Sequence, residues 1–146
     1  MNTVFEDEFM DVQAGLISLC LEVTEEKVNK VYAYCCNEKK RKMFNAFFVI
    51  NEEVKGLHEL GIVNQLAFQF LKLGTKDLTK VDAICQKHNM PTPTEMKLCY
   101  DVTTGKFNAD YKYEEVCSAR TEKNPVDVFL EWIQEIKGRI GDGSLS

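Results

Sequence analysis

The chain has 146 residues, 45% of them hydrophobic, which is within the usual size of one domain and enough for one ordinary core. Its 18 basic and 23 acidic residues give a formal charge of −5, which disfavours nonspecific nucleic-acid binding because phosphate neutralisation needs clustered lysine and arginine. No run approaches the about 18 consecutive apolar residues of a membrane span, and the chain opens on acidic rather than basic residues, so we expect a cytoplasmic protein.

The first half of the chain has the pattern of a helix followed by a hairpin. Apolar residues recur at helical spacing over residues 4–23, which predicts a first helix. Residues 28–36 and 43–50 are rich in tyrosine, phenylalanine and valine, and the polar residues 37–42 separate them, which is typical of two antiparallel strands. Residues 52–61 then form a polar connection that contains two glycines.

A long apolar stripe follows and predicts helical structure over residues 62–88. Whether this is one helix or two is open, because Gly74 costs about 1 kcal/mol relative to alanine in a helix interior. Thr75 is in addition a suitable cap for a second helix. Pro91 and Pro93 end the helical region, since proline lacks the amide donor and restricts the residue before it.

The last third predicts a second hairpin and a final helix. Residues 95–102 and 106–116 are the expected strands, joined by a turn at residues 103–105. In the second strand, apolar and aromatic residues alternate with polar ones, as expected for a half-buried strand. Asn124 is a suitable N-cap for a helix that begins at Pro125.

Two hairpins separated by a long helix predict an α+β fold with the order α-β-β-α-β-β-α. Because no βαβ alternation demands a parallel sheet, we expect an antiparallel sheet of about four strands with helices packed on one face. Residues 1–140 are expected to form a single domain. Residues 141–146 have no apolar period, so they are expected to be a flexible C-terminal tail.

The cysteines and histidines do not predict a reactive or metal site. Most of the six cysteines lie inside apolar segments, where a reduced thiol packs as a small hydrophobe. Cys35 and Cys36 are neighbours in a strand and should point to opposite faces, one buried and one exposed. Cys85 and His88 share a helical face, but no Cys-x-x-Cys or His-x-x-x-His pattern supplies the other ligands of a zinc site. We therefore expect no metal and no cofactor.

No catalytic residues are predicted either, because two histidines and scattered cysteines suggest no nucleophile, base and orienting group. Carboxylates and a tyrosine do gather at the predicted strand ends and hairpin edges. Such residues are usually a solvated surface, but they also suit a metal or acid/base site, or a patch for protein recognition in which tyrosine provides contact area and carboxylates steer the partner. The candidates are Glu52, Glu53, Asp101, Asp110, Tyr113, Glu114 and Glu115.

Three strings in this order resemble the YezG-like immunity proteins, small cytoplasmic antitoxins that protect bacteria from secreted polymorphic toxins, many of them nucleases. The strings are Lys30-Val31-Tyr32-Ala33-Tyr34, residues 106–116, and Pro125 followed seven residues later by Trp132, and together they span most of the chain. The chain departs from the family in the more apolar long helix and in Val126-Asp127-Val128-Phe129, where a basic residue is expected soon after the proline. These differences leave the identity of the toxin open.

The resemblance implies that the chain binds a cognate toxin domain and blocks or distorts its active site, with the seven candidates as toxin contacts. The net acidity fits a basic partner of the nuclease type, because opposite charges raise encounter rates. No direct nucleic-acid partner and no membrane are expected, and the sequence is compatible with a monomer or a dimer. Two other classes stay open: a small enzyme that uses the carboxylates, and a generic protein-interaction adaptor.

Overall fold

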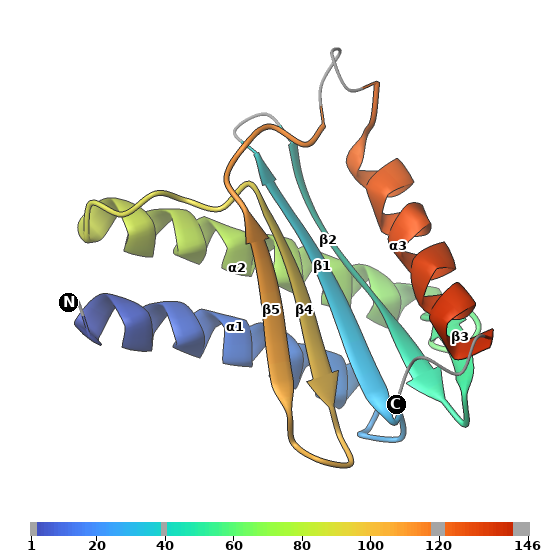
Figure 1. Ribbon diagram of the computed structural model, residues 1–146. Coiled ribbons are helices and arrows are strands. Elements are labelled where there is room, and N and C mark those ends of the chain that lie inside the picture. Colours follow the sequence, from blue (N-terminus) through green and yellow to red (C-terminus); the bar gives the residue numbers. More distant parts are fainter. Residues whose placement is uncertain (1–2, 39–40, 118–121, 142–146) are drawn as a thin grey trace.

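The computed structural model describes residues 3–38, 41–117 and 122–141. They form three layers, with an antiparallel sheet between two helices on one face and one helix on the other (Figure 1). The predicted α+β class is confirmed. The elements are α1 (Thr3–Val23), β1 (Lys30–Glu38), β2 (Arg41–Ile50), β3 (Glu53–Gly56), α2 (Asn64–Lys87), β4 (Glu95–Asp101), β5 (Phe107–Lys112) and α3 (Pro125–Gly141).

The sheet has five strands in the order β3-β2-β1-β4-β5, each antiparallel to its neighbours. Both predicted hairpins are present, β1 with β2 and β4 with β5, and β1 joins them at the centre of the sheet. The fifth strand, β3, lies in the segment that we expected to be a polar connection. This strand has only four residues, and Val54 is its single hydrophobic side chain. So short a segment shows no alternation of apolar and polar residues by which a strand could be recognised.

The expectation that all helices pack on one face of the sheet is wrong. Helices α1 and α2 cover one face, where Val31, Ala33 and Cys35 of β1 belong to the core. Helix α3 covers the other face, and its Trp132 packs edge-on against Tyr32 of β1 at 5.6 Å between ring centroids. The physical reason is that β1 carries six consecutive apolar residues, 31–36, as in a central strand that is buried on both faces.

Burial on both faces also corrects the prediction for the adjacent cysteines. Cys35 faces α1 and α2, and Cys36 faces α3, so the two side chains do point to opposite faces. Both are buried nevertheless, because each face has its own covering layer.

Helix α2 is a single helix, and its Gly74 has a packing role. A Cβ atom at this position would lie 2.0 Å from Cδ2 of Phe44, a buried residue of β2. The glycine therefore lets the helix approach the sheet more closely than any larger residue would allow. This close approach explains why the helix contains a glycine at a position where helix propensity alone suggests a break.

The start of α3 matches the prediction. The Asn124 side-chain oxygen accepts a hydrogen bond from the Asp127 amide at 2.9 Å, and the Asp127 carboxylate accepts one from the Asn124 amide at 3.2 Å. This reciprocal arrangement satisfies amides that the first turn of a helix leaves unpaired. At the other end, Gly141 still belongs to the helix, and residues 142–146 of the predicted tail lie outside the described residues. No helix in the described part of the chain is long and apolar enough to cross a membrane.

Candidate functional site

A groove runs between the β4–β5 hairpin and α3 on the α3 face of the sheet. Helix α3 packs on β2 and β3 and over the tyrosines of β1, so it leaves the same face of β4 and β5 uncovered. Two hollows follow the groove, of about 290 and 440 Å³. We define the groove by six side chains from three elements: Lys97 of β4, Asp110 and Lys112 of β5, and Trp132, Glu135 and Arg139 of α3.

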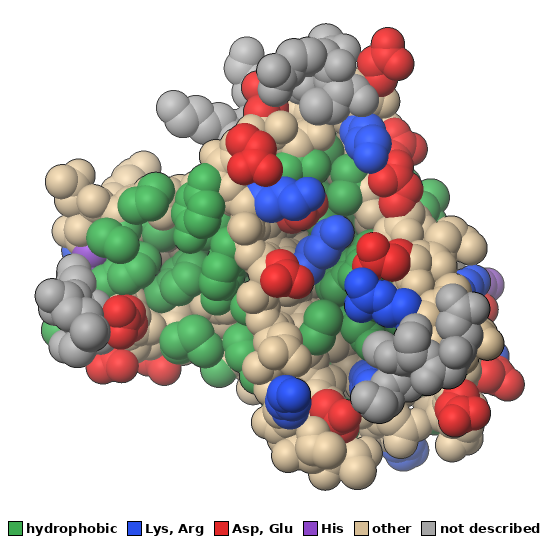
Figure 2. All heavy atoms as spheres, in the orientation of Figure 1, with side chains coloured by type: hydrophobic (Ala, Val, Ile, Leu, Met, Phe, Trp, Pro, Cys, Tyr) green, Lys and Arg blue, Asp and Glu red, His purple; other side chains and the backbone are tan. Residues whose placement is uncertain are grey.

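Opposite charges alternate along this groove, and Figure 2 shows them side by side down the middle of this face. Lys97 and Asp110 are register partners across the β4–β5 ladder, and the Lys97 ammonium lies 5.5 Å from the ring centroid of Trp132. On α3, Arg139 pairs with Glu135 at 3.4 Å. Both members of the Arg139–Glu135 pair are exposed, so this ion pair contributes little to stability. The charges are therefore accessible for recognition.

Strand β5 shows the predicted alternation. Phe107, Ala109 and Tyr111 are partly buried against the core, and the Tyr111 hydroxyl donates to Oε1 of Gln13 on α1 at 2.6 Å. Asn108, Asp110 and Lys112 are exposed on the groove side. One face of this edge strand thus holds the fold together, and the other carries polar groups that packing does not use.

The structure brings some of the seven predicted site residues together and separates others. Asp110 lines the groove, and Asp101 lines its hollow at the end of β4. Asp101 also has a local role, because its Oδ1 accepts the amides of Thr103 and Thr104 at 2.9 and 3.1 Å in the hairpin turn. Asp101 is thus at least partly a turn residue.

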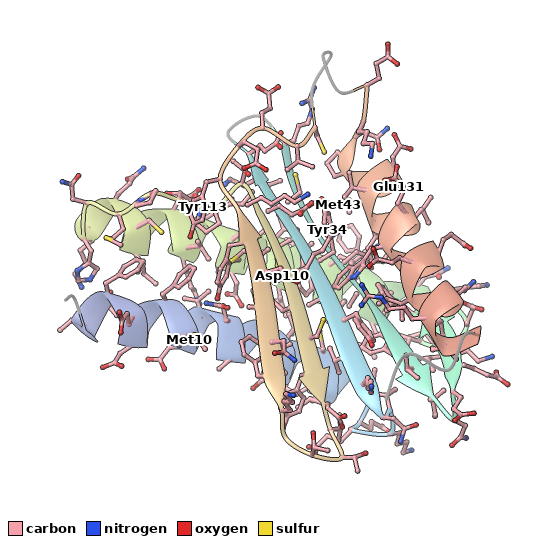
Figure 3. The ribbon with its side chains drawn as sticks, viewed as in Figure 1. Met10, Tyr34, Met43, Asp110, Tyr113 and Glu131 are labelled. Atoms are coloured by element: carbon pink, nitrogen blue, oxygen red, sulfur yellow. The ribbon has the colours of Figure 1, made fainter. Side chains whose placement is uncertain are left out.

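Tyr113, Glu114 and Glu115 form an exposed segment directly after β5, at the opposite end of the hairpin from Asp101. Figure 3 labels Tyr113 in this segment. Burial raises the pKa of Tyr113, with a smaller contribution from Cys85, and Tyr113 is not among the residues that line the groove. The Thr94 hydroxyl donates to the Glu114 carbonyl at 2.5 Å, which ties the segment to the start of β4.

Glu52 and Glu53 lie at the far edge of the sheet. Glu53 begins β3 and pairs with Lys55 at 3.1 Å, and Glu52 is in the preceding turn. Four strand spacings separate β3 from β5, which is about 19 Å at the usual spacing between strands. The seven candidates therefore do not form one compact patch.

The thiols of this protein are poorly suited to nucleophilic chemistry. Burial raises the pKa of Cys36 to about 12 and that of Cys99 to about 11, and it also raises the pKa of Cys20, Cys35, Cys85 and Cys117. A reactive thiol has the opposite shift, toward the thiolate.

Neither histidine lines the groove. His88 lies 3.1 Å from Glu8 of α1 and packs edge-on against Phe5, so it joins the ends of α1 and α2. His58 is exposed in the turn after β3. Cys85 and His88, the pair weighed as zinc ligands, have no third donor within reach among the described residues, whereas Cys36, Glu38 and Cys117 do have their donor atoms gathered.

No protein-family model and no curated protein matches this chain. The candidate site is therefore argued from its own geometry. Five of the six groove residues were not among the predicted site residues: Lys97, Lys112, Trp132, Glu135 and Arg139. A signal for Lys97 was present, since the turn at residues 103–105 sets a register that places it opposite Asp110. The α3 residues had no such signal, because the position of that helix depends on tertiary packing.

Proposed function

We propose that this protein is an immunity protein of the YezG-like type, which acts in the cytoplasm by binding a cognate toxin domain and blocking or distorting its active site. The observation that carries the proposal is the groove between β4–β5 and α3 together with the exposed acidic segment beside it. An aromatic side chain, here Trp132, with charged side chains around it is the composition of a protein recognition surface. The choice of a toxin domain as the partner rests on the sequence strings that resemble the YezG-like family.

The chemistry of the described side chains supports binding over catalysis. An enzyme requires a nucleophile or base with a suitably shifted pKa beside its substrate pocket. Here the thiols are shifted away from the reactive form, and both histidines lie outside the groove. The groove carboxylates Asp110 and Glu135 face lysine and arginine side chains, an arrangement that suits steering and register.

We infer that the toxin is basic and of the nuclease type, and that it approaches the β5 side of the sheet. The net charge of −5 attracts a cationic domain over the distance that salt screening allows. Asp110, Glu114 and Glu115 lie together on the β5 side, whereas Glu52 and Glu53 are at the other edge. The first group is therefore expected to contribute more to the encounter.

The first step of the test is to search the genes beside the one for this chain for a secreted toxin. The toxin domain found there is purified as an inactive variant for binding and in active form for inhibition. The double variant Glu114→Lys with Glu115→Lys should bind at least about 10-fold more slowly at low salt, within the range by which steering raises association rates. Glu52→Lys with Glu53→Lys makes the same change in net charge at the far edge and is the matched control. It should keep an association rate close to that of the unmodified protein.

Raising the salt concentration should also slow association of the unmodified protein with the toxin. The Debye length falls from about 10 Å at 0.1 M to about 3 Å at 1 M, so association should slow across this range. A toxin that is neither bound nor inhibited would refute the proposed function. Equal effects of the two double variants would refute only the placement of the toxin on the β5 side.

A further inference from the structure

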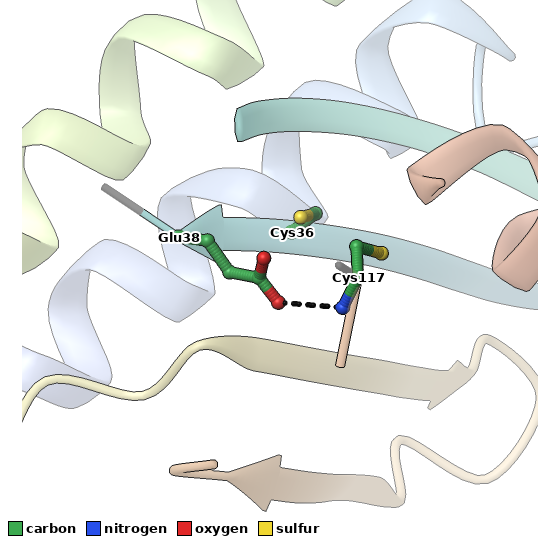
Figure 4. Close-up of side chains that lie close together, drawn as sticks. All are labelled: Cys36, Glu38 and Cys117. Carbon is green, nitrogen blue, oxygen red and sulfur yellow. Dashed lines mark hydrogen bonds between the residues drawn. The ribbon is translucent and has the colours of Figure 1, made fainter. Parts of the chain in front are cut away.

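A second cluster of functional side chains lies on the α3 face, where the end of β1 meets the segment that follows β5 (Figure 4). Cys36 and Glu38 come from β1, and Cys117 comes from a part of the chain far away in sequence. Their sulfur and carboxylate oxygen atoms all lie within 4.8 Å of one another, and all three residues are buried. No other group of three such donors is found in the described ranges.

Backbone hydrogen bonds hold the cluster in place. Oε2 of Glu38 accepts the amides of Val116 at 2.8 Å and Cys117 at 3.0 Å, which fixes both the carboxylate and the segment that carries the second thiol. The Arg41 guanidinium lies 3.8 Å from Oε1 of Glu38 and donates to the Cys117 carbonyl. The donors are therefore held close together before any ligand binds.

We propose that Cys36, Cys117 and Glu38 form a zinc-binding site, with water in the fourth position. Two thiolates and one carboxylate are a ligand set that zinc accepts. Zinc binding breaks the two S–H bonds and releases both thiol protons to solvent, after which the three donors carry three negative charges. A bound Zn²⁺ then leaves a net charge of −1, and Arg41 beside Glu38 balances it. A buried site needs this neutrality, since an uncompensated charge in the protein interior is costly.

The spacing of the donors fits a small closing movement. Tetrahedral coordination with Zn–S bonds of about 2.3 Å places two sulfur atoms about 3.8 Å apart. The donor atoms already lie within 4.8 Å of one another, so a closing movement of at most about 1 Å between the two sulfur atoms is enough. Oε1 of Glu38 is the oxygen that faces Arg41, and Oε2 keeps its two amide partners.

Zinc at this position would fasten the segment after β5 to the central strand of the sheet. That segment carries Glu114 and Glu115, so the site would also fix the acidic surface beside the groove. The inference about the metal does not depend on the proposed function, because it concerns only the affinity of the isolated protein for the ion.

The experiment is a metal titration of the purified full chain, kept reduced and first stripped with a chelator. Co²⁺ is added as a spectroscopic probe, and Zn²⁺ is then used to displace it. The expected result is one Co²⁺ per chain with a near-ultraviolet thiolate-to-cobalt absorption that one equivalent of Zn²⁺ removes. Cys36→Ser and Cys117→Ser should each weaken Zn²⁺ binding by more than about 100-fold, beyond the about 10–100-fold that loss of an outer partner causes.

Cys99→Ser is the matched control, because Cys99 is a thiol on the neighbouring strand β4 and packs against the same apolar cluster without belonging to the donor group. It should bind zinc as the unmodified protein does. If a cysteine variant fails to fold, the unmodified chain provides a second measurement, since zinc should raise its Tm and a chelator should reverse the rise. Absence of stoichiometric binding, absence of the thiolate absorption, or an equal loss in Cys99→Ser would overturn the zinc site.

Discussion

Replacing Gly74 with alanine should destabilise the protein, although alanine is the better helix former. On helix propensity alone the change would stabilise α2 by about 1 kcal/mol. The structure predicts the opposite sign, because the new methyl group would lie 2.0 Å from Cδ2 and 2.4 Å from Cγ of the Phe44 ring. Helix propensity and steric overlap have opposite effects at this position, so the sign of the measured change in unfolding free energy shows which is larger.

The size of the effect follows from the overlap. Carbon atoms pack favourably at about 3.5–4.0 Å, so the ring or the helix must move by about 1.5 Å. Phe44 has little room to do so, because it is buried and packs against the Phe70 ring at 5.2 Å between centroids. Overpacking of a core costs about 1–3 kcal/mol, and an overlap this large belongs at the upper end. After the propensity gain is subtracted, Gly74→Ala should lower the free energy of unfolding by about 2 kcal/mol.

Denaturant unfolding followed by circular dichroism measures this difference, and the Tm should fall by about 6 °C in a chain of this length. Gly138→Ala is the control, because this glycine lies in α3 with nothing within 4 Å of the added Cβ, and there the unfolding free energy should rise by up to about 1 kcal/mol. Adding Phe44→Leu to Gly74→Ala should recover part of the loss, since the smaller side chain leaves space for the methyl group. If Gly74→Ala stabilises the protein as much as Gly138→Ala does, the close approach of α2 to the sheet is refuted.

Two further predictions concern buried and exposed carboxylates. Tyr34→Phe should lower the free energy of unfolding by about 1–3 kcal/mol in denaturant titrations. The Tyr34 hydroxyl donates to the buried Glu95 carboxylate at 3.0 Å, and its loss leaves that carboxylate short of a partner. An unchanged unfolding midpoint would contradict this hydrogen bond. Hydrogen bonds from Lys87 and His88 lower the pKa of Glu8, so this carboxylate stabilises the fold above its unfolded pKa of about 4.5, and the contribution is lost as pH falls through the lower folded pKa. Glu8→Gln should therefore lower the Tm at pH 6 and change it progressively less as pH falls toward 3; a difference that does not depend on pH would count against the linkage.

The elements that the sequence predicted well are those with a strong local period. The apolar stripe of α1, the alternation in β5 and the Asn124 cap of α3 are all features of a few neighbouring residues. The structure departs from the prediction where the position of an element depends on which helix packs on a face of the sheet. β1 has apolar residues on both of its faces. This run predicts a strand, but a short run does not by itself indicate which elements cover each face.

The candidate site was harder to predict for the same reason. The predicted strand ends and hairpin edges contain Asp110 and the acidic segment, but they also contain Glu53, which the strand order places at the other edge of the sheet. The groove needed Arg139 and Trp132, whose position follows only from where α3 packs. The donor cluster of Cys36 and Cys117 is a long-range contact between a strand and a loop, which no spacing in the sequence indicates.

The same two-sided burial explains why the accessible chemistry gathers along β5. Most side chains of the central strands β1 and β2 are used in packing on both faces, so these strands present few polar groups away from the Arg41–Lys42 end of their hairpin. β5 packs against the core through Phe107 and Tyr111 on one face only, and α3 stops short of covering the other. Its outward residues and the segment that follows it can therefore vary in charge with little cost to the core. A partner that recognises this protein through polar side chains is expected to find them there, whatever the chemistry of that partner.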